Sequence, residues 1–402
     1  MREVEQYIYD NWDKVIRENR ADDGTLIGLP FPYTVPCAEG TFQELYYWDT
    51  YFTNVGLILS GRTNLAKNNV DNMLFLIERY GFMPNGSRTF YQYRSQPPFL
   101  SEMVKDIFDK TGDTAWLAEA YATLTREYAF WQKDRLTDTG LNRYYGQLTS
   151  FADNADAICE RLGIPLPTDA AEKERLGESA YSTYESGWDC TSRFALYAQD
   201  IVPVDLNALL YGMEKNMARF SRILGNGDEG RWSQRAEQRR ARMNAVLWDD
   251  GVGGFCDYDF RNKEKRTLAS TAMFYPLFFG AADDRQTAKT VGLLPRLEFP
   301  YGLAGCEDRE DVMGLQWDYP NGWACQQYMV IRALDERGYR VDAVRLARKY
   351  VALVEKVFRQ TGSLWEKYNV TDGTVSVNKE YETPTMMGWS AGVYLYCLKI
   401  AG

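Results

Sequence analysis

The chain has 402 residues, of which 45% are hydrophobic and 25% charged, a balance that is typical of a protein with a large buried core and that excludes a disordered chain. The 46 Lys and Arg residues are outnumbered by 56 Asp and Glu residues, and the net charge of −10 without a basic run argues against a nucleic acid or an anionic membrane as partner. Histidine is absent, which excludes Ser-His and Cys-His hydrolases and removes the commonest zinc ligand.

Apolar residues recur every three or four positions along most of the chain, which predicts a protein built mainly of amphipathic helices. The clearest helix is predicted for residues 64–80, with Thr63 or Asn64 as its N-cap and a glycine after its last turn. A second is predicted for 206–224, with Asp205 as the N-cap candidate and a glycine as the stop. Further helices are expected at about 3–18, 49–60, 99–111, 115–134, 190–200, 231–248, 268–279, 322–337, 344–358 and 388–400.

Few segments have the alternating pattern of a strand, and the best of them is 253–260, which is followed by a turn-like RNKEK segment. Residues 136–188 are rich in Gly, Pro and polar residues, and we expect a long surface loop there, of the kind that often contributes to active sites. No linker or charge block divides the chain, so we expect one domain over residues 1–402. About twelve antiparallel helices suit either a closed ring of helix pairs or an α-solenoid.

The cysteines and the first residues both bear on the compartment. The seven cysteines are scattered, odd in number and without a CxxC spacing, which is typical of reduced core thiols in a reducing compartment. The start of the chain carries charges where a secretory signal has an apolar stretch, and no segment reaches the length of a membrane-spanning helix. We therefore expect a cytoplasmic protein.

Between the predicted helices lie segments with unusual concentrations of Trp, Asp, Asn, Arg, Gln and Gly. Such side chains suit a sugar site, because flat aromatic rings pack on sugar C–H faces while carboxylates, amides and guanidinium groups bind the hydroxyls. Aromatic and acidic residues also gather at ordinary helix caps and in cores, and composition alone favours neither interpretation. The segments are 40–52, 85–98, 185–193, 316–324, 364–369 and 379–392.

In this order the segments closely resemble glycoside hydrolase family 37, the α,α-trehalases. GTFQELYYWDTYF at 40–52 resembles the first signature of that family, and QWDYPNGWA at 316–324 contains the second almost unchanged. The resemblance extends from about residue 40 to about residue 393. It implies an all-α fold, the (α/α)6 barrel of the six-hairpin glycosidases, in which six inner helices lie inside six outer ones and the sugar pocket is at one end.

The resemblance also implies a catalytic pair. Asp189 in ESGWDCTSR matches the general acid of the family, although the residues alone would favour an N-cap of the predicted helix 190–200. Glu366 in LWEKYN matches the general base, with a solvated glutamate paired to Lys367 as the alternative. An acid that holds its proton near neutral pH needs burial or a nearby carboxylate. An inverting enzyme would hold the two carboxyl groups roughly 6.5–9.5 Å apart, with room for a water.

The remaining family positions concern sugar binding. Arg94 suits that role because its planar guanidinium can donate to two adjacent hydroxyls, with a loop salt bridge as the alternative. Trp365 and Trp389 are weaker candidates, because single tryptophans are more often core residues. The substrate-binding residues that we predict from the resemblance are Phe42, Trp48, Asp49, Asn85, Arg94, Ser95, Gln96, Gly187, Trp317, Asp318, Trp323 and Glu380.

Two departures from the family pattern bear on the substrate, and a third bears on water exclusion. The family usually has an arginine at the position of Thr41, and no convincing match to its sugar-contacting Arg-x-Glu segment lies in 146–184. Its glycine-rich lid is replaced by VTDGTVSVN at 370–378, which predicts different water exclusion. The same stretch, 146–184, offers replacement cations in Arg161, Lys173 and Arg175.

The resulting hypothesis is an inverting glycoside hydrolase that cleaves α,α-trehalose into two glucose molecules. One alternative is an exo-acting α-glucosidase for another short α-glucoside, such as kojibiose or glucosylglycerate, and a second is a sugar-binding helical barrel without catalysis. Carboxylate catalysis needs no Lewis acid, so we expect no metal and no cofactor. We expect a small disaccharide as the partner, with no nucleic acid and no membrane.

Overall fold

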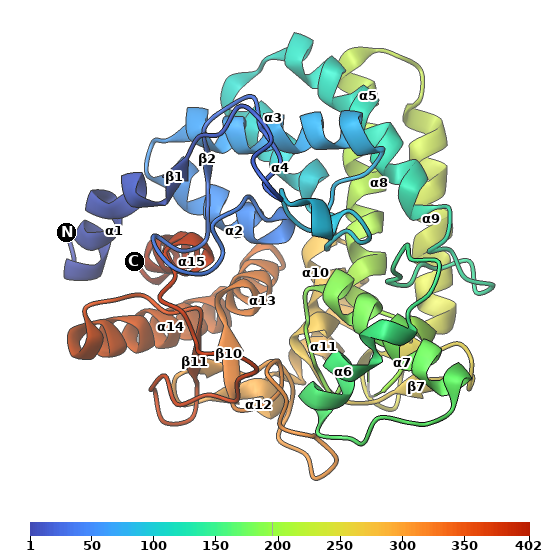
Figure 1. The fold of residues 1–402 in the computed structure, drawn as a ribbon. Helices are drawn as coiled ribbons and strands as arrows, with labels where there is room; N and C mark the ends of the chain where they lie inside the picture. Colours follow the sequence, from blue (N-terminus) through green and yellow to red (C-terminus); the bar gives the residue numbers. More distant parts are fainter. Residues whose placement is uncertain (195) are drawn as a thin grey trace.

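The structure is a computed structural model that describes residues 1–194 and 196–402. Within these residues, six helices form a closed inner ring, in which each contacts the next and the last returns to the first (Figure 1). The predicted (α/α)6 barrel is thereby confirmed, and the alternative, an α-solenoid, is wrong because the ring is closed. In ring order the inner helices are α2 (Tyr47–Leu59), α4 (Leu100–Thr111), α8 (Val204–Leu224), α10 (Tyr275–Phe279), α13 (Ala324–Glu336) and α15 (Gly388–Ala401).

Outer helices cover the ring and bury one face each. α3 (Thr63–Tyr80) contacts α2 and α4, and α5 (Thr114–Trp131) contacts α4 and α8. α9 (Glu229–Val246) packs on α8, and α14 (Arg340–Thr361) packs on α13 and α15. The inner helices α2 and α8 are buried over most of their length, whereas α14 buries a single apolar stripe, as an outer helix should. The shorter helices are α1 (Glu3–Asn11), α11 (Asp284–Val291) and α12 (Leu294–Leu297).

The ends of the long helices follow the predicted stops but not the predicted starts. Gly81 and Gly225 end α3 and α8 in the left-handed conformation, with φ of 83° and 64°, because glycine adopts it without a steric penalty. The N-cap residues are Arg62 and Pro203, so the predicted caps of these two helices are wrong. Asp205 lies in the first turn of α8, where it forms an ion pair with Arg193.

The ring closes where α2 and α15 cross, and two glycines allow the close approach. A Cβ atom on Gly56 would lie 2.5 Å from the Cα of Gly392, and one on Gly392 would lie 2.0 Å from the carbonyl oxygen of Phe52. Contacts this short leave no room for any side chain. The first and last inner helices therefore pack backbone against backbone.

The stretch 136–188 is not the long loop that we predicted, because it contains two helices, α6 (Ala155–Leu162) and α7 (Ala170–Ser186). The side chain of Asp169 caps α7 by accepting from the N–H of Glu172 at 2.9 Å. The apolar residues of α6 and α7, together with Cys190, form a small cluster of their own beside the main core. The sparse apolar content of the two helices explains the error. The buried members of that cluster are Ala155, Ile158, Cys159, Leu176, Ala180 and Cys190.

The helix predicted for 190–200 is wrong. Cys190 has φ of 52°, residues 192–194 form a turn, and only a 3₁₀ turn, η4 (Ala198–Asp200), precedes α8. Ala195, which falls inside this prediction, lies outside the described residues. The predicted helix 3–18 is shorter than expected, since α1 ends at Asn11 and a 3₁₀ turn, η1 (Trp12–Val15), follows.

The strands are short and join loops at the ends of the barrel. The predicted strand 253–260 is two strands, β5 (Gly254–Phe255) and β6 (Asp257–Asp259), and the turn after it leads into β7 (Glu264–Arg266). β10 (Asn321–Trp323) pairs antiparallel with β11 (Lys367–Asn369), which places Trp323 opposite Lys367. The others are β1 (Ile16–Arg17), β2 (Tyr33–Thr34), β3 (Ile201–Val202), β4 (Trp248–Asp249), β8 (Glu298–Phe299) and β9 (Gly302–Leu303).

The remaining 3₁₀ turns are η2 (Thr89–Tyr91), η3 (Ala152–Asn154) and η5 (Thr271–Phe274), and η5 together with α10 makes up the helix predicted for 268–279. Within the described part of the chain, no helix is both long and apolar enough to cross a membrane.

Candidate active site

A cavity of about 500 Å³ lies where α2, α13 and α15 begin, and most of the predicted site residues line it. Segments far apart in the sequence meet there only because the ring is closed. Their roles in binding and catalysis stay predictions. The predicted residues that line the cavity are Phe42, Trp48, Asp49, Asn85, Arg94, Gln96, Gly187, Asp189, Trp317, Trp323 and Glu366.

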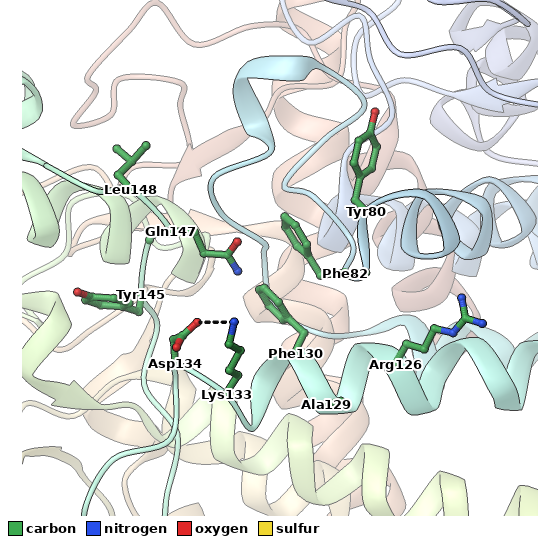
Figure 2. A pocket seen from close by; sticks show the side chains of 12 residues that line it. Tyr80, Phe82, Arg126, Ala129, Phe130, Lys133, Asp134, Tyr145, Gln147 and Leu148 are labelled. Carbon is green, nitrogen blue, oxygen red and sulfur yellow. Dashed lines mark ion pairs between the residues drawn. The ribbon is translucent and has the colours of Figure 1, made fainter.

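A larger hollow, of about 800 Å³, lies beside α5 and is less suited to this chemistry (Figure 2). Phe82 and Phe130 stack in it at a centroid distance of 4.6 Å, and Lys133 and Asp134 form an ion pair at 3.9 Å. Asp134 is the only acid among the described residues that line it. Glycoside hydrolysis ordinarily needs two carboxyl groups, so we assign the chemistry to the smaller cavity.

Asp189 lies in a tight segment directly after α7. Gly187 ends that helix with φ of 70°, and a Cβ atom on it would lie 2.7 Å from the ring of Trp48, so a glycine allows the indole to approach. No helix follows Asp189 in the described residues 190–194, so the N-cap interpretation is wrong. Burial and the charge of Glu380 raise the pKa of Asp189 to about 7, against the opposing effect of Arg161 and Arg94. The group therefore holds a proton near neutral pH, as a general acid must.

Glu366 lies in the bend between α14 and β11, on another wall of the same cavity. Its side chain is buried, with Oε2 2.5 Å from Nζ of Lys367 and Oε1 accepting from the hydroxyl of Tyr381 at 2.7 Å. Pairing with Lys367 is thus observed, but both groups are buried and not on a solvated surface. A carboxylate held by two donors is poised to accept a proton rather than to deliver one.

Tryptophan rings form an apolar wall of the cavity. Trp317 and Trp323 stack in parallel at 3.8 Å, Trp48 lies 5.6 Å from Trp317, and Trp389 meets Trp323 edge-on at 5.8 Å. Stacked rings fix the orientation of the wall and present a flat face to a sugar. The indole of Trp389 also donates to the carbonyl oxygen of Glu366 at 3.1 Å, which ties the wall to the candidate base.

Arg94 is held by aromatic rings instead of a carboxylate. Its guanidinium carbon lies 5.1 Å from the ring centroids of Tyr91 and Tyr184 and 5.5 Å from that of Tyr181. It forms no ion pair with any described residue, so the loop salt bridge that was its alternative is wrong for residues 1–194 and 196–402. The buried Nε has no hydrogen-bond partner there, and the group is available to a ligand.

Asp49 adds a third carboxyl group to the cavity. Burial raises its pKa to about 8, and the charges of Glu366 and Asp189 add to the shift. A neutral carboxyl group can donate a hydrogen bond as well as accept one. Asp49 is therefore suited to binding a sugar hydroxyl and poorly suited to acting as the base.

Three predicted site residues do not line the cavity. Ser95 donates from its hydroxyl to the carbonyl of Met83 at 2.7 Å, and Asp318 accepts from the N–H of Ser192 at 2.8 Å and from its hydroxyl at 2.6 Å. These two side chains hold loops that carry Arg94 and Asp189. Glu380 is not among the lining residues and pairs with Arg161 at 3.3 Å.

Several lining residues were missed from the sequence or were not among the predicted substrate-binding residues. Arg161 comes from α6 and packs over the ring of Tyr184 at 4.6 Å, so one of the three cations named as replacements does reach the cavity. Arg175 pairs instead with Asp200 at 2.7 Å. Tyr46 and Gln316 lie inside the segments that carry the resemblance and could have been found there, and Trp389, which was only a weaker candidate, also lines the cavity. The missed or lower-ranked lining residues are Thr41, Tyr46, Tyr91, Arg161, Tyr184, Gln316, Tyr381, Glu382, Met386 and Trp389.

Comparison with known proteins identifies a family for the chain. A family model described as Trehalase matches residues 1–402. Similar proteins include the periplasmic trehalase of Xanthomonas oryzae pv. oryzae, 34% identical over 97% of this chain and 72% of that protein. A periplasmic trehalase of Xanthomonas campestris pv. campestris is 33% identical over 99% of this chain and 73% of its own length.

Solved structures agree with this result. The neutral trehalase of Saccharomyces cerevisiae has a TM-score of 0.82 at 28% identity, over 99% of this chain and 80% of that one. A GH63 mannosylglycerate hydrolase from Thermus thermophilus has a TM-score of 0.68 at 16% identity, over 98% of this chain and 99% of that one, a likeness that concerns the fold alone.

The cytoplasmic location that we expected is contradicted, because these Xanthomonas relatives are named periplasmic trehalases. The cysteine argument failed for a physical reason. All seven thiols are free and buried, and a thiol enclosed in the core is shielded from oxidants in any compartment.

Proposed function

The chain belongs to the trehalase family, and on that premise we propose that it hydrolyses the α,α-glycosidic bond of trehalose to give two molecules of glucose. The observation that carries the proposal is the contrast between two carboxyl groups on one aromatic-walled cavity. Asp189 has a raised pKa and keeps its proton, whereas Glu366 contacts a buried cation. A donor and an acceptor of protons facing one ligand is what glycoside hydrolysis requires.

In the proposed reaction Asp189 gives its proton to the oxygen between the two glucose rings as the bond from that oxygen to the anomeric carbon breaks. Glu366 takes a proton from a water that attacks the same carbon from the opposite face. One glucose leaves with the former glycosidic oxygen as its hydroxyl group, and the other, which gains its hydroxyl from the water, is released in the β-configuration. Proton exchange with solvent then restores both groups. The separation of the two carboxyl groups, roughly 6.5–9.5 Å in an inverting enzyme, stays a prediction.

Binding of the disaccharide is assigned to the other lining residues. The tryptophan wall suits the apolar faces of the glucose rings, while Arg94, Asn85 and Gln96 offer donors to the hydroxyls. We further propose that residues 1–402 form one catalytic domain, which is supported by a continuous buried cluster from Val4 to Ala401.

The alternative substrate, another short α-glucoside, is favoured by Thr41, which lines the cavity without the charge that the family usually has there. Glucose release from trehalose, kojibiose, maltose and glucosylglycerate distinguishes the two functions. We expect trehalose to have the highest kcat/KM, and a higher value for another glucoside would replace our proposal with the exo-acting α-glucosidase. Release from none of the four would favour a sugar-binding barrel without catalysis.

Proton NMR of early turnover tests the stereochemistry. We expect β-glucose from the cleaved α-linkage before mutarotation mixes the anomers, because the water attacks once, from the opposite face. Early formation of α-glucose alone would mean retention, and Glu366 would then be a nucleophile.

A further inference from the structure

Lys367, the residue after the candidate base, is a buried cation that the proposed reaction does not use. Its side chain has 0% exposure, and its Nζ lies 2.5 Å from Oε2 of Glu366 and 3.2 Å from Oε1 of Gln316. The ring faces of Trp323 and Tyr381 lie 4.7 Å and 4.8 Å from the same nitrogen. Taking an ammonium group out of water is unfavourable unless it is paired, so this lysine is held by the carboxylate that it contacts.

Tyr381 completes the arrangement from the other side. Its hydroxyl donates to Oε1 of Glu366 at 2.7 Å, and burial raises the pKa of Tyr381 well above its usual range, so the phenol keeps its proton and remains a donor. Both oxygens of Glu366 therefore have a donor, one charged and one neutral. Two donors in fixed positions set the plane of the carboxylate.

Two cations besides Lys367, Arg94 and Arg161, line the same cavity, whereas the acidic groups that interact with Glu366 do not favour its charge. They are the carboxyl groups of Asp49 and Asp189 and the thiols of Cys37 and Cys325. Burial raises the pKa of each of these four groups. Each is neutral while it keeps its proton, and each becomes negative, and so repels Glu366, when it loses that proton. Among the described residues, Lys367 is the cation in ion-pair contact with Glu366.

We propose that Lys367 and Tyr381 are positioning residues for the base, which hold Glu366 in the ionised form and aim its free lone pairs at the attacking water. The inference rests on the proposed function and extends it to residues that act through Glu366. A cation in contact with a carboxylate favours the ionised form, and its removal leaves a buried charge unpaired. Without that contact, the charged form that the base needs would be less favoured, and activity would be lost over more of the acid range.

The test is the pH dependence of kcat/KM on trehalose for Lys367→Met, Lys367→Arg and Tyr381→Phe. In Lys367→Met we expect the acidic limb to move about 1–3 pH units upward, the usual size of an opposite-charge effect at this range, with kcat reduced more than KM is changed. Lys367→Arg keeps the charge and should hold the limb near its wild-type position. Tyr381→Phe removes a neutral donor and should move the limb in the same direction by less.

Lys105→Met is the matched control, because Lys105 forms a largely buried pair with Glu102 on α4, away from the cavity. Its acidic limb should stay at the wild-type pH. An unmoved acidic limb in Lys367→Met would overturn the inference and leave Lys367 a structural residue. If Lys367→Met does not fold, the acidic limb of Tyr381→Phe is the test, and an unmoved limb in that variant would overturn the inference. If the wild type itself does not hydrolyse trehalose, the proposed function is overturned instead, so the two failures are distinguishable.

Discussion

Asp189 and Glu366 carry the same functional group in opposite surroundings, and we expect both to be essential. Asp189→Asn and Glu366→Gln keep the shape of the side chain and remove proton exchange, so each should lower kcat by about 10²–10⁴-fold while circular dichroism stays close to wild type. Glu366→Gln should also lower the melting temperature, because it leaves the buried Lys367 without its carboxylate partner. Steady-state kinetics on trehalose gives the measurement. A variant that keeps more than about a tenth of wild-type activity would remove that residue from the catalytic pair.

The pH profile follows from the raised pKa of Asp189. The acid must be protonated to act, so activity should be present below a pH of about 7 and should fall as the pH rises through that value. The charge of Glu380 raises this pKa, and Glu380→Gln should therefore move the basic limb of kcat/KM to lower pH. A basic limb that stays in place in Glu380→Gln would show that another group sets it.

Arg161 is the cation that we expect to compensate for Thr41 in the cavity. Arg161→Met should raise KM for trehalose by about tenfold to a hundredfold, because a charge-assisted hydrogen bond to a hydroxyl contributes about 1.5–3 kcal/mol. Arg175→Met is the control, since Arg175 pairs with Asp200 and does not line the cavity. Equal values of KM in both variants and in wild type would mean that Arg161 does not contact the substrate.

The sequence identifies the segments that form the site better than it identifies the direction in which each side chain points. Trp317 and Asp318 are neighbours in one motif, yet the first lines the cavity and the second turns to Ser192 and holds the loop after the acid. Tyr381 follows a predicted residue and contacts the base, although nothing in its sequence neighbours indicates that contact. Arg161 lies outside every motif, and only the fold brings it to the cavity.

Helices were predictable where one face is apolar over many turns, as in α3 and α8. α7 has mostly polar residues, and long-range contacts fix its end. The buried Glu185 on α7 accepts from the N–H groups of Ser95 and Tyr145 at 2.7 Å and 2.8 Å and from Nε of Arg135 at 2.8 Å. These bonds tie the helix before Asp189 to the loop that carries Arg94, and no local pattern predicts them.

The crossing of α2 and α15 gives a prediction for an element. Gly392→Ala should lower the free energy of unfolding by about 1–3 kcal/mol or more, because the added methyl group overlaps the carbonyl oxygen of Phe52 and the helices must separate. Urea unfolding measures the change. Gly230→Ala on α9 is the control, since a Cβ atom added there would have nothing within 4 Å and alanine favours a helix by about 0.4–1 kcal/mol. Equal stability of Gly392→Ala and wild type would contradict the close packing.

For the whole molecule, the chemistry that we propose runs on carboxyl groups alone. Activity on trehalose should be unchanged after dialysis against EDTA, because the chain has no histidine and the described residues contain no acidic or thiol cluster with metal-binding geometry. Activity that is lost in the chelator and restored by a divalent ion would contradict a mechanism based on Asp189 and Glu366 alone.

The closed ring also determines when the active site can form during synthesis of the chain. α2 emerges from the ribosome more than 300 residues before its partner α15, which brings Trp389 with it. Until then, the apolar flank of α2 that packs on α15 has no partner within the nascent chain, and such pairings between distant segments form slowly. The unpaired flank of α2 must therefore be kept from aggregating until α15 has been made, and hydrolysis can begin only after that helix has joined the ring.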